Sequence, residues 1–175
     1  MLFRSRCGEI VKNLLAFSRQ SKITIENHNI VGIIDRTLAL ISHDLEIKGI
    51  QFNKTIQPNL PEVKCDFKLI QQALLNIIYN ASDAMPNGGI LTVTADKSPG
   101  TRRSVEVAIS DTGSGIAEED MENIFEPFFT TKEEGKGVGL GLSVVYGIIT
   151  RHNGTVAAES EPGKGSIFRV CLPFV

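Results

Sequence analysis

The stretch from Asp66 to Met85 constrains the fold of this chain most strongly, because its apolar residues recur at the spacing of one helix face. Asp66 stands where a helix N-cap is expected, and the turn-forming sequence Pro86-Asn87-Gly88-Gly89 ends the pattern. The apolar face consists of Leu69, Ile70, Ala73, Leu74, Ile77, Ile78, Ala81 and Ala84. A helix with so broad an apolar face must be buried against other elements.

Further helices and strands are predicted on both sides of this helix. Apolar residues at helical spacing predict helices over 3–19, 30–47, 118–124 and 140–151, and either Asn27 or Asn29 can cap the second of them. Alternation predicts strands over 50–56, which is expected to be half-buried, over 90–95 and 105–109, which form a hairpin, and over 155–160 and 166–172. The expected fold is α+β, a two-layer α/β sandwich. Helices cover one face of its mixed, mostly antiparallel sheet, and one N-terminal helix precedes it.

Charge and composition exclude several classes of function. The net charge is −2 and the basic residues are spread along the chain, so no nucleic-acid partner is expected. No apolar run approaches the roughly 18 residues of a membrane span, so no membrane contact is expected from this segment. Cys7, Cys65 and Cys171 are isolated, which argues against a disulfide framework and a zinc site and favours a reducing compartment.

Asn76 and Asn80 lie one turn apart on the helix that follows Asp66, and therefore share a face. One interpretation is that both are surface residues. Their apolar neighbours favour a buried setting instead, in which an amide needs a partner. An amide oxygen is a hard, neutral ligand that suits Mg²⁺ already surrounded by phosphate oxygens and waters. The pair is therefore a candidate magnesium site.

Asp111 directly follows a predicted apolar strand, and Gly113 and Gly115 stand in the turn beyond it. A carboxylate held at a strand end can accept a hydrogen bond from an exocyclic amino group such as that of adenine. The glycines allow the backbone to approach a planar ring closely. The alternative is a turn in which Asp111 accepts only from its own backbone.

The glycine-rich sequence Gly135-Lys136-Gly137-Val138-Gly139-Leu140-Gly141 leads into the helix predicted from Leu140, an arrangement typical of phosphate sites. The dinucleotide fingerprint is excluded, because no strand precedes the segment and Leu140 and Leu142 stand where that fingerprint needs glycine. The sequence also lacks GxxxxGK[ST] and the protein-kinase motifs. Nucleotide chemistry in this chain must use another scaffold.

Taken together, five ordered segments resemble the ATP-binding catalytic domain of sensor histidine kinases of the nitrogen-regulation and oxygen-sensing type. These kinases belong to the ATPase superfamily that includes gyrase and MutL. The segments are 72–85, 111–116, 124–132, 137–142 and 163–168. Residues 13–19 also resemble the end of a dimerisation helix. The resemblance implies the C-terminal part of a dimerisation helix over 1–22 and a Bergerat-type ATP-binding domain over 23–175.

The resemblance also implies a site for ATP and Mg²⁺. Asn80 would coordinate the metal, Asp111 would bond the adenine amino group, and the catalytic set would be Asn76, Asn80 and Lys132. The nucleotide-binding set would be Asn80, Asp83, Ala84, Asp111, Gly113, Gly115, Ile116, Phe125, Thr130, Thr131, Lys132, Lys136, Gly137, Val138, Gly139, Leu140, Gly141, Leu142 and Ser166. The glycine-rich residues among them would close over the phosphates.

Asn76 separates the expected reaction from hydrolysis. Gyrase-like members have a water-activating glutamate at this place, four residues before the magnesium asparagine, and an amide takes up no proton at neutral pH. The resemblance instead implies transfer of the γ-phosphoryl group to a histidine on a dimerisation domain, with a response regulator receiver domain downstream. The full-length protein is expected to be a homodimer, and to be cytoplasmic or the cytoplasmic part of a membrane-anchored kinase.

The three histidines of this chain do not match the acceptor of such kinases, a histidine followed by an acidic residue on the first dimerisation helix. His28, His43 and His152 lie elsewhere, with no partner evident in the sequence, and each is expected to be structural or solvated. The chain alone is therefore expected to bind ATP but not to autophosphorylate. Two alternatives stay open: a non-enzymatic ATP-binding or interaction module, and a gyrase- or MutL-like ATPase.

Overall fold

The structure, a computed structural model, describes residues 23–98, 103–132 and 137–174. Its three α-helices in these ranges are α2 (Ile30–Ile47), α3 (Phe67–Ala84) and α4 (Gly141–Arg151). Asn29 caps α2 by accepting from the Val31 N–H, and Asp66 caps α3 by accepting from the N–H groups of Lys68 and Leu69. The helix and dimerisation segment predicted within residues 1–22 lie outside the described residues.

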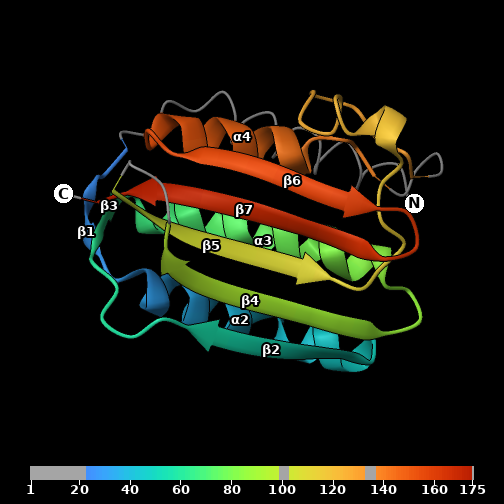
Figure 1. Ribbon diagram of the computed structural model, residues 1–175, viewed down its shortest axis with the longest axis horizontal. Coiled ribbons are helices and arrows are strands. Elements are labelled where there is room, and N and C mark those ends of the chain that lie inside the picture. The colour runs from blue at the N-terminus through green and yellow to red at the C-terminus, as the bar shows by residue number, and fades with distance from the viewer. Residues whose placement is uncertain (1–22, 99–102, 133–136, 175) are drawn as a thin grey trace, which may run out of the picture.

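Five strands form one sheet in the order β2-β4-β5-β7-β6. Their bounds are β2 Ile50–Ile56, β4 Gly89–Lys97, β5 Ser104–Asp111, β6 Thr155–Glu161 and β7 Gly165–Pro173. Only β2 and β4 pair in parallel, and the other three neighbouring pairs are antiparallel. All three helices lie behind the same face of the sheet (Figure 1). The predicted two-layer sandwich with a mixed, mostly antiparallel sheet is thus confirmed.

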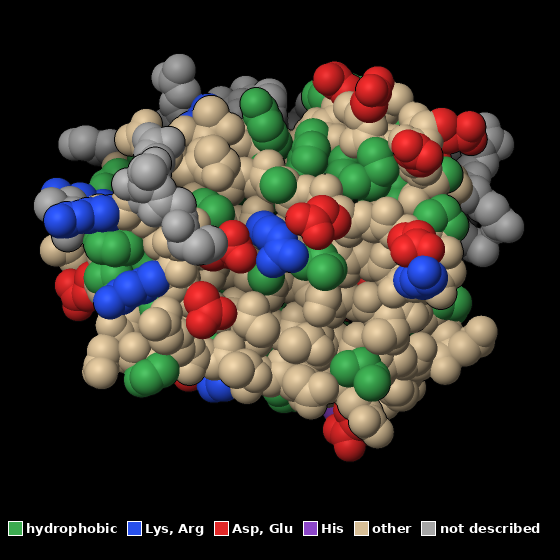
Figure 2. All heavy atoms as spheres, viewed as in Figure 1, with side chains coloured by type: hydrophobic (Ala, Val, Ile, Leu, Met, Phe, Trp, Pro, Cys, Tyr) green, Lys and Arg blue, Asp and Glu red, His purple; other side chains and the backbone are tan. Residues whose placement is uncertain are grey.

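The core lies between the sheet and the helices, with α3 packed between α2 and α4. Alternation along the strands turns one set of side chains inward, so Val93, Val107 and Val170 are almost fully buried. On the opposite face Arg169 of β7 pairs with Glu106 of β5 and Glu159 of β6, at 3.4 Å in each case. Basic, acidic and hydrophobic side chains are scattered over this face (Figure 2). No helix in the described ranges is both long and apolar enough to cross a bilayer.

Two local predictions were wrong. Residues 118–124 do not form an α-helix but begin with a single 3₁₀ turn, Glu118–Asp120. Only Ile124 is buried in this stretch, so a helix there would gain too little from packing to offset its nucleation. Strand β2 is not half-buried, because it is an edge strand in which Ile50 alone is buried. A second sheet, in which β1 (Glu26–His28) pairs with β3 (Val63–Cys65), was not predicted, since three residues carry no measurable period.

The cap of α2 gives a prediction about stability. Replacing Asn29 by Ala should lower the free energy of unfolding by about 1 kcal/mol, because the Val31 N–H loses its acceptor. Thermal unfolding should show this as a decrease of about 2–4 °C in Tm. Asn53→Ala, on the exposed edge strand β2, is the matched control and should stay within about 0.5 kcal/mol of the parent. Equal Tm values for the two variants would contradict the role of the cap.

Candidate active site

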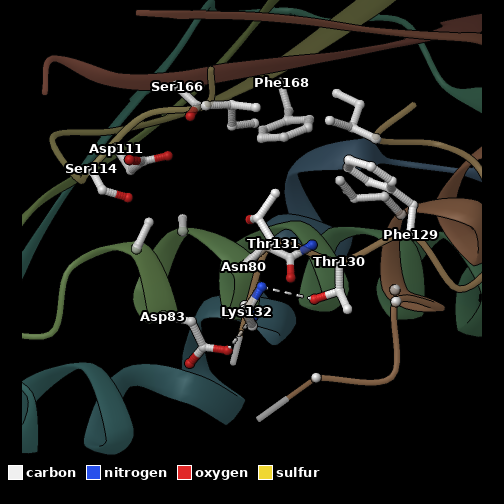
Figure 3. Close-up of a pocket in the computed structure, with 18 of the residues that line it drawn as sticks. Asn80, Asp83, Asp111, Ser114, Phe129, Thr130, Thr131, Lys132, Ser166 and Phe168 are labelled. Carbon is white, nitrogen blue, oxygen red and sulfur yellow. Dashed lines mark hydrogen bonds and ion pairs between the residues drawn. The ribbon is translucent and has the colours of Figure 1, made fainter. Parts of the chain in front are cut away.

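A cavity of about 460 Å³ lies where the C-terminal end of α3 meets the end of β5 and the start of α4. This volume falls within the range of about 300–1,000 Å³ that is usual for small-molecule sites. Figure 3 shows polar side chains from α3, from the end of β5, from β7 and from the segment 124–132 gathered around it. Most of the predicted nucleotide-binding residues line it: Asn80, Asp83, Ala84, Asp111, Gly115, Ile116, Thr130, Thr131, Lys132, Gly137, Val138, Gly139, Leu140, Gly141, Leu142 and Ser166.

Asp111 ends β5 and continues the inward-facing series of Val107 and Ile109. Asp111 is only 6% exposed, and its carboxylate accepts a hydrogen bond of 2.8 Å from the Gly113 N–H. Burial raises the pKa of Asp111, although backbone N–H bonds from Gly113 and Ser166 work in the opposite direction. The site therefore holds a desolvated carboxylate, and its oxygens have lone pairs left to accept from a ligand. The turn interpretation is correct for the bond to Gly113, but it does not account for the burial.

The glycines after Asp111 are needed for packing. A Cβ at Gly113 would lie 2.6 Å from the Ala84 carbonyl oxygen, and one at Gly115, where φ is +68°, would collide with the Glu161 carbonyl. The Ser114 N–H in turn donates to the Ala84 carbonyl at 3.1 Å. The loop is thus pressed against the end of α3 and the turn between β6 and β7. Gly113 does not line the pocket itself.

Asn76 and Asn80 have different surroundings although they share a face of α3. Asn76 donates from Nδ2 to the Gly141 carbonyl at 3.2 Å and does not line the cavity. Asn80 lines it, and a Cβ at Gly141 would lie 3.6 Å from Asn80 Nδ2. Asn76 therefore joins α3 to the first residue of α4, while Asn80 is the amide that faces the cavity at this junction.

Asp83 and Lys132 form an ion pair at the edge of the cavity, with 2.8 Å between Lys132 Nζ and Asp83 Oδ2. Lys48 Nζ lies 3.1 Å from the other carboxylate oxygen, Asp83 Oδ1. Partial burial raises the pKa of Asp83, but the hydrogen bonds and charges of Lys132 and Lys48 outweigh it, so the net effect lowers this pKa. Asp83 is therefore firmly ionised and bonded to two ammonium groups.

The segment before the glycine-rich residues is fixed by close backbone contacts. Phe128 has φ of +70°, and its N–H donates to the Gly139 carbonyl at 2.8 Å. A Cβ at Gly139 would lie 2.5 Å from the Phe128 carbonyl carbon and from the Phe129 carbonyl oxygen. Phe125 was predicted to bind the nucleotide, but it does not line the cavity. It packs against Tyr146 of α4 instead, with 5.9 Å between ring centroids. Lys136 lies outside the described residues.

Comparison with known proteins identifies the scaffold on which these features stand. Residues 65–175 match the family described as histidine kinase-, DNA gyrase B-, and HSP90-like ATPase. The chain belongs to this ATPase family.

Related proteins and structures are sensor kinases. Sensor histidine kinase ZraS of Escherichia coli (strain K12) is 36% identical over 168 residues, which are 96% of this chain and 35% of ZraS. Sensor kinase CckA of Brucella abortus (strain 2308) is 38% identical over 185 residues, covering 97% of this chain and 19% of CckA. The chain thus spans about a third or less of these relatives. The nucleotide-free catalytic domain of histidine kinase ThkA is 30% identical, with a TM-score of 0.75, and the match covers 86% of this chain and 97% of the ThkA chain. Full-length ShkA in complex with AMPPNP is 28% identical, with a TM-score of 0.83, and the match covers 95% of this chain and 35% of the ShkA chain.

The donor set of this member of the ATPase family fits an adenine nucleotide. Asp111 supplies a buried acceptor to the cavity, and Asn80 supplies a neutral amide oxygen. Apolar side chains that also line the cavity can contact a planar base: Ile116, Ile124, Leu142 and Phe168. Helix α4 starts at Gly141 without a side-chain cap, which leaves its first N–H groups to other acceptors, as phosphate oxygens are.

Several cavity residues were not predicted: Ala81, Ser114, Ile124, Phe129 and Phe168. A signal existed for some of them. Phe168 lies two positions after Ser166 on β7, so both side chains face the helices. Ala81 follows Asn80 on the buried side of α3. Phe129 is part of the segment 124–132 that was recognised, but only the backbone contacts described above bring it to the cavity.

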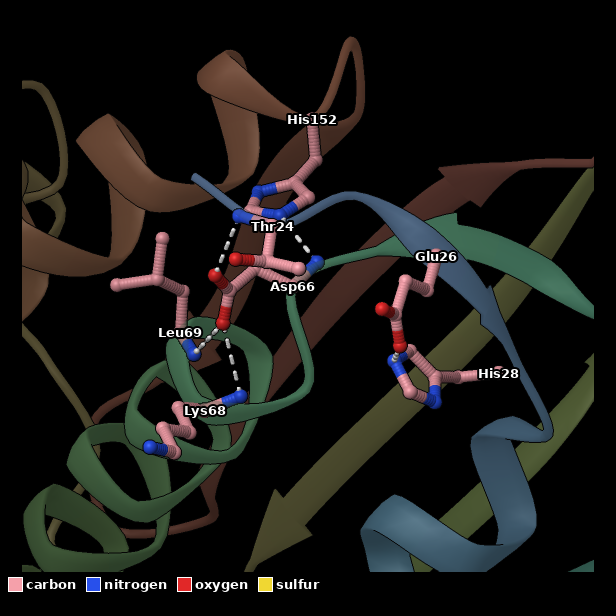
Figure 4. Close-up of polar contacts among 7 residues, drawn as sticks. All are labelled: Thr24, Glu26, His28, Asp66, Lys68, Leu69 and His152. Carbon is pink, nitrogen blue, oxygen red and sulfur yellow. Dashed lines mark hydrogen bonds and ion pairs between the residues drawn. The ribbon is translucent and has the colours of Figure 1, made fainter. Parts of the chain in front are cut away.

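None of the three histidines lines the cavity. His43 is exposed on α2. The expectation that these residues have no partner was wrong for His152, which is 3% exposed and accepts from the Asp66 N–H at 2.9 Å, while its Nδ1 lies 2.7 Å from the Ile148 carbonyl oxygen. His28 packs edge-on against Phe67 and lies 3.9 Å from Glu26 (Figure 4). His152 therefore has a structural role, in line with the expectation for it.

Proposed function

We propose that this chain is the catalytic domain of a two-component sensor histidine kinase, which binds ATP with Mg²⁺ and donates the γ-phosphoryl group to a histidine on a dimerisation domain. The observation that carries the proposal is the buried carboxylate of Asp111 facing the same cavity as Asn80 and the start of α4. Because these groups line one cavity, a base and a polyphosphate can bind in it together.

Each residue has a defined part in this proposal. Asp111 accepts from the adenine amino group, and Ile116 and Phe168 enclose the base. Bound Mg²⁺ would neutralise charge on the phosphates, with Asn80 as its protein ligand. The N–H groups at the start of α4 and the ammonium group of Lys132 would orient the phosphates. Since phosphoryl transfer depends mainly on positioning and charge neutralisation, these groups suffice for the role of a donor site.

Asn76 supports transfer over hydrolysis. Its amide nitrogen donates to the Gly141 carbonyl, and an amide accepts no proton from water at neutral pH. With an amide at this place instead of a carboxylate, the proposed nucleophile is the imidazole of a separate domain. Asn76 then acts as a positioning residue that holds α4 against α3.

The proposal extends to partners that are known for related proteins. ThkA, 28% identical with TM-score 0.80 over 98% of this chain and 48% of its own, has been crystallised in complex with the response regulator protein TrrA. By analogy, we propose a receiver domain as the downstream partner of this kinase, a dimerisation domain of the same kinase as its direct acceptor, and a homodimer as the full-length state. A cytoplasmic location, where ATP and receiver domains meet, belongs to the same proposal.

A transfer assay tests the proposed activity. The chain is incubated with [γ-³²P]ATP, Mg²⁺ and the dimerisation domain of the same kinase as a separate protein. Label should appear on the acceptor histidine and on nothing else, because the chain carries the donor site and its own histidines lie outside the cavity.

An acceptor with its histidine replaced by alanine is the control and should stay unlabelled. Steady release of phosphate without labelled acceptor would instead favour a gyrase- or MutL-like ATPase. Tight ATP binding with neither transfer nor hydrolysis would favour a non-enzymatic module, and both results would overturn the kinase proposal.

A further inference from the structure

Asp83 accepts from two lysines, one at each oxygen of its carboxylate. Lys48 is the C-cap residue of α2, and Lys132 comes from the segment that borders the cavity. Lys132 is the only cation among the described residues that line the cavity. Its ammonium group is nevertheless held against α3 by Asp83, one turn after Asn80 (Figure 3). The charge best placed to bind phosphate is therefore already bonded to a carboxylate of the protein.

We propose that Asp83 is the resting counter-ion of Lys132, and that the phosphates of a bound nucleotide displace it. The ammonium group then exchanges one anionic partner for another. This inference rests on the proposed function of the cavity as an ATP site. It adds a positioning role for Asp83 and Lys48, which act through Lys132 and need not contact the nucleotide.

The exposure of the pair makes such an exchange feasible. The side chains of Lys132 and Asp83 are 35% and 43% exposed. An ion pair as exposed as this favours the paired position of the ammonium group over the free one by only about two- to fivefold. A triphosphate carries several negative charges in place of one and therefore competes well for the same ammonium group. The pair is strong enough to keep Lys132 beside the cavity and weak enough to release it.

Lys48 completes the exchange on the side of the carboxylate. Its Nζ lies 3.1 Å from Asp83 Oδ1, whereas Lys132 bonds Oδ2. When Lys132 leaves, Asp83 keeps one cationic partner and is not left as an unpaired negative charge beside the phosphates. Both lysines lower the pKa of Asp83, so the carboxylate stays ionised in either arrangement near neutral pH.

The path of the Lys132 side chain supports a movable ammonium group on a fixed backbone. The Lys132 N–H donates to Thr130 Oγ1 at 3.2 Å, which holds the turn. A Cβ at Gly137 would lie 3.1 Å from Lys132 Cδ and 3.2 Å from Thr130 Oγ1. The absence of a side chain at Gly137 thus leaves room for the aliphatic part of Lys132 to pass and to change direction.

A mutant cycle tests the exchange. Calorimetry measures the affinity for ATP with Mg²⁺ in the parent chain, Asp83→Asn, Lys132→Met and the double variant. Asp83→Asn should tighten ATP binding by about two- to fivefold, since it frees Lys132, and this gain should disappear in the Lys132→Met background. Adenosine, which has no phosphate, is the control ligand, and its affinity should not change with Asp83→Asn.

The other outcomes contradict the inference. Equal tightening with and without Lys132 would mean that Asp83 acts only through its general charge, and weaker ATP binding by Asp83→Asn would make Asp83 a ligand of the nucleotide or metal. Lys48→Met provides a second test: it should weaken ATP binding when Asp83 is present and have little effect in the Asp83→Asn background. If the parent chain bound neither ATP nor adenosine, the proposed function itself would fail.

Discussion

Replacing Asp111 by Asn should weaken ATP binding by about 1.5–3 kcal/mol, or about 10- to 150-fold, the range for a hydrogen bond to a charged group. Asp111 is only 6% exposed, so the bond of its carboxylate to an adenine amino group would form with little competition from water. Asparagine keeps the size of the side chain and one acceptor oxygen for the Gly113 N–H, but it removes the charge. Calorimetric titration with ATP measures the loss directly.

A matched control separates this effect from general charge removal. Asp96→Asn removes a carboxylate at the exposed end of β4, outside the cavity, and should leave the affinity for ATP unchanged. Adenosine should lose affinity with Asp111→Asn by the same factor as ATP, because the bond is to the base. Unchanged affinity of Asp111→Asn for both ligands would refute the assignment of the adenine contact.

Asp111→Asn should also change how the free energy of unfolding depends on pH. Burial raises the pKa of Asp111, with backbone hydrogen bonds from Gly113 and Ser166 opposing it, so the folded chain binds this proton more tightly than the unfolded chain. A contribution of this sign is present at low pH and is lost as the pH rises through the raised pKa. The parent should therefore lose stability relative to Asp111→Asn over that rise. A site built for function explains why an unfavourable buried charge is kept there.

The elements with a clear period were predictable from sequence, because burial of one face decides them locally. Helix α3 was predicted with its cap Asp66, and the predicted start of α4 differs from the observed one by one residue. The inward direction of Asp111 also follows from the alternation that Val107 and Ile109 begin. The order and direction of the strands needed the structure, since the parallel pairing of β2 with β4 leaves no local signal.

The side-chain partners of the site were not predictable, because they join residues far apart in the chain. Lys132 and Asp83 are separated by 49 positions, and Asn76 meets the Gly141 carbonyl across 65. Sequence motifs placed Phe125 in the pocket, whereas contact with Tyr146 turns it toward α4. Motifs thus located the cavity, but the ion pair that decides where the ammonium group of Lys132 rests depends on how α2, α3 and the segment 124–132 converge.

Asn80→Ala should abolish the Mg²⁺ dependence of ATP binding and lower the rate of phosphoryl transfer by about 10²-fold or more, as loss of a group that neutralises transition-state charge does. Asn80 supplies the amide that faces the cavity beside the start of α4, so its removal takes away the proposed protein ligand of the metal. Titration with ATP in the presence and absence of Mg²⁺, together with the transfer assay, measures both effects.

Two further variants decide whether the loss is due to metal coordination. Asn80→Asp keeps an oxygen ligand and should restore part of the Mg²⁺ dependence, which a purely structural role of the amide would not produce. Asn123→Ala removes an exposed amide outside the cavity and should behave like the parent. Asn76 lies one turn before Asn80, and its amide holds α4 in place. Asn76→Ala should therefore lower the rate of phosphoryl transfer without changing the Mg²⁺ concentration that ATP binding requires. Persistence of full Mg²⁺ dependence in Asn80→Ala would mean that other groups hold the metal.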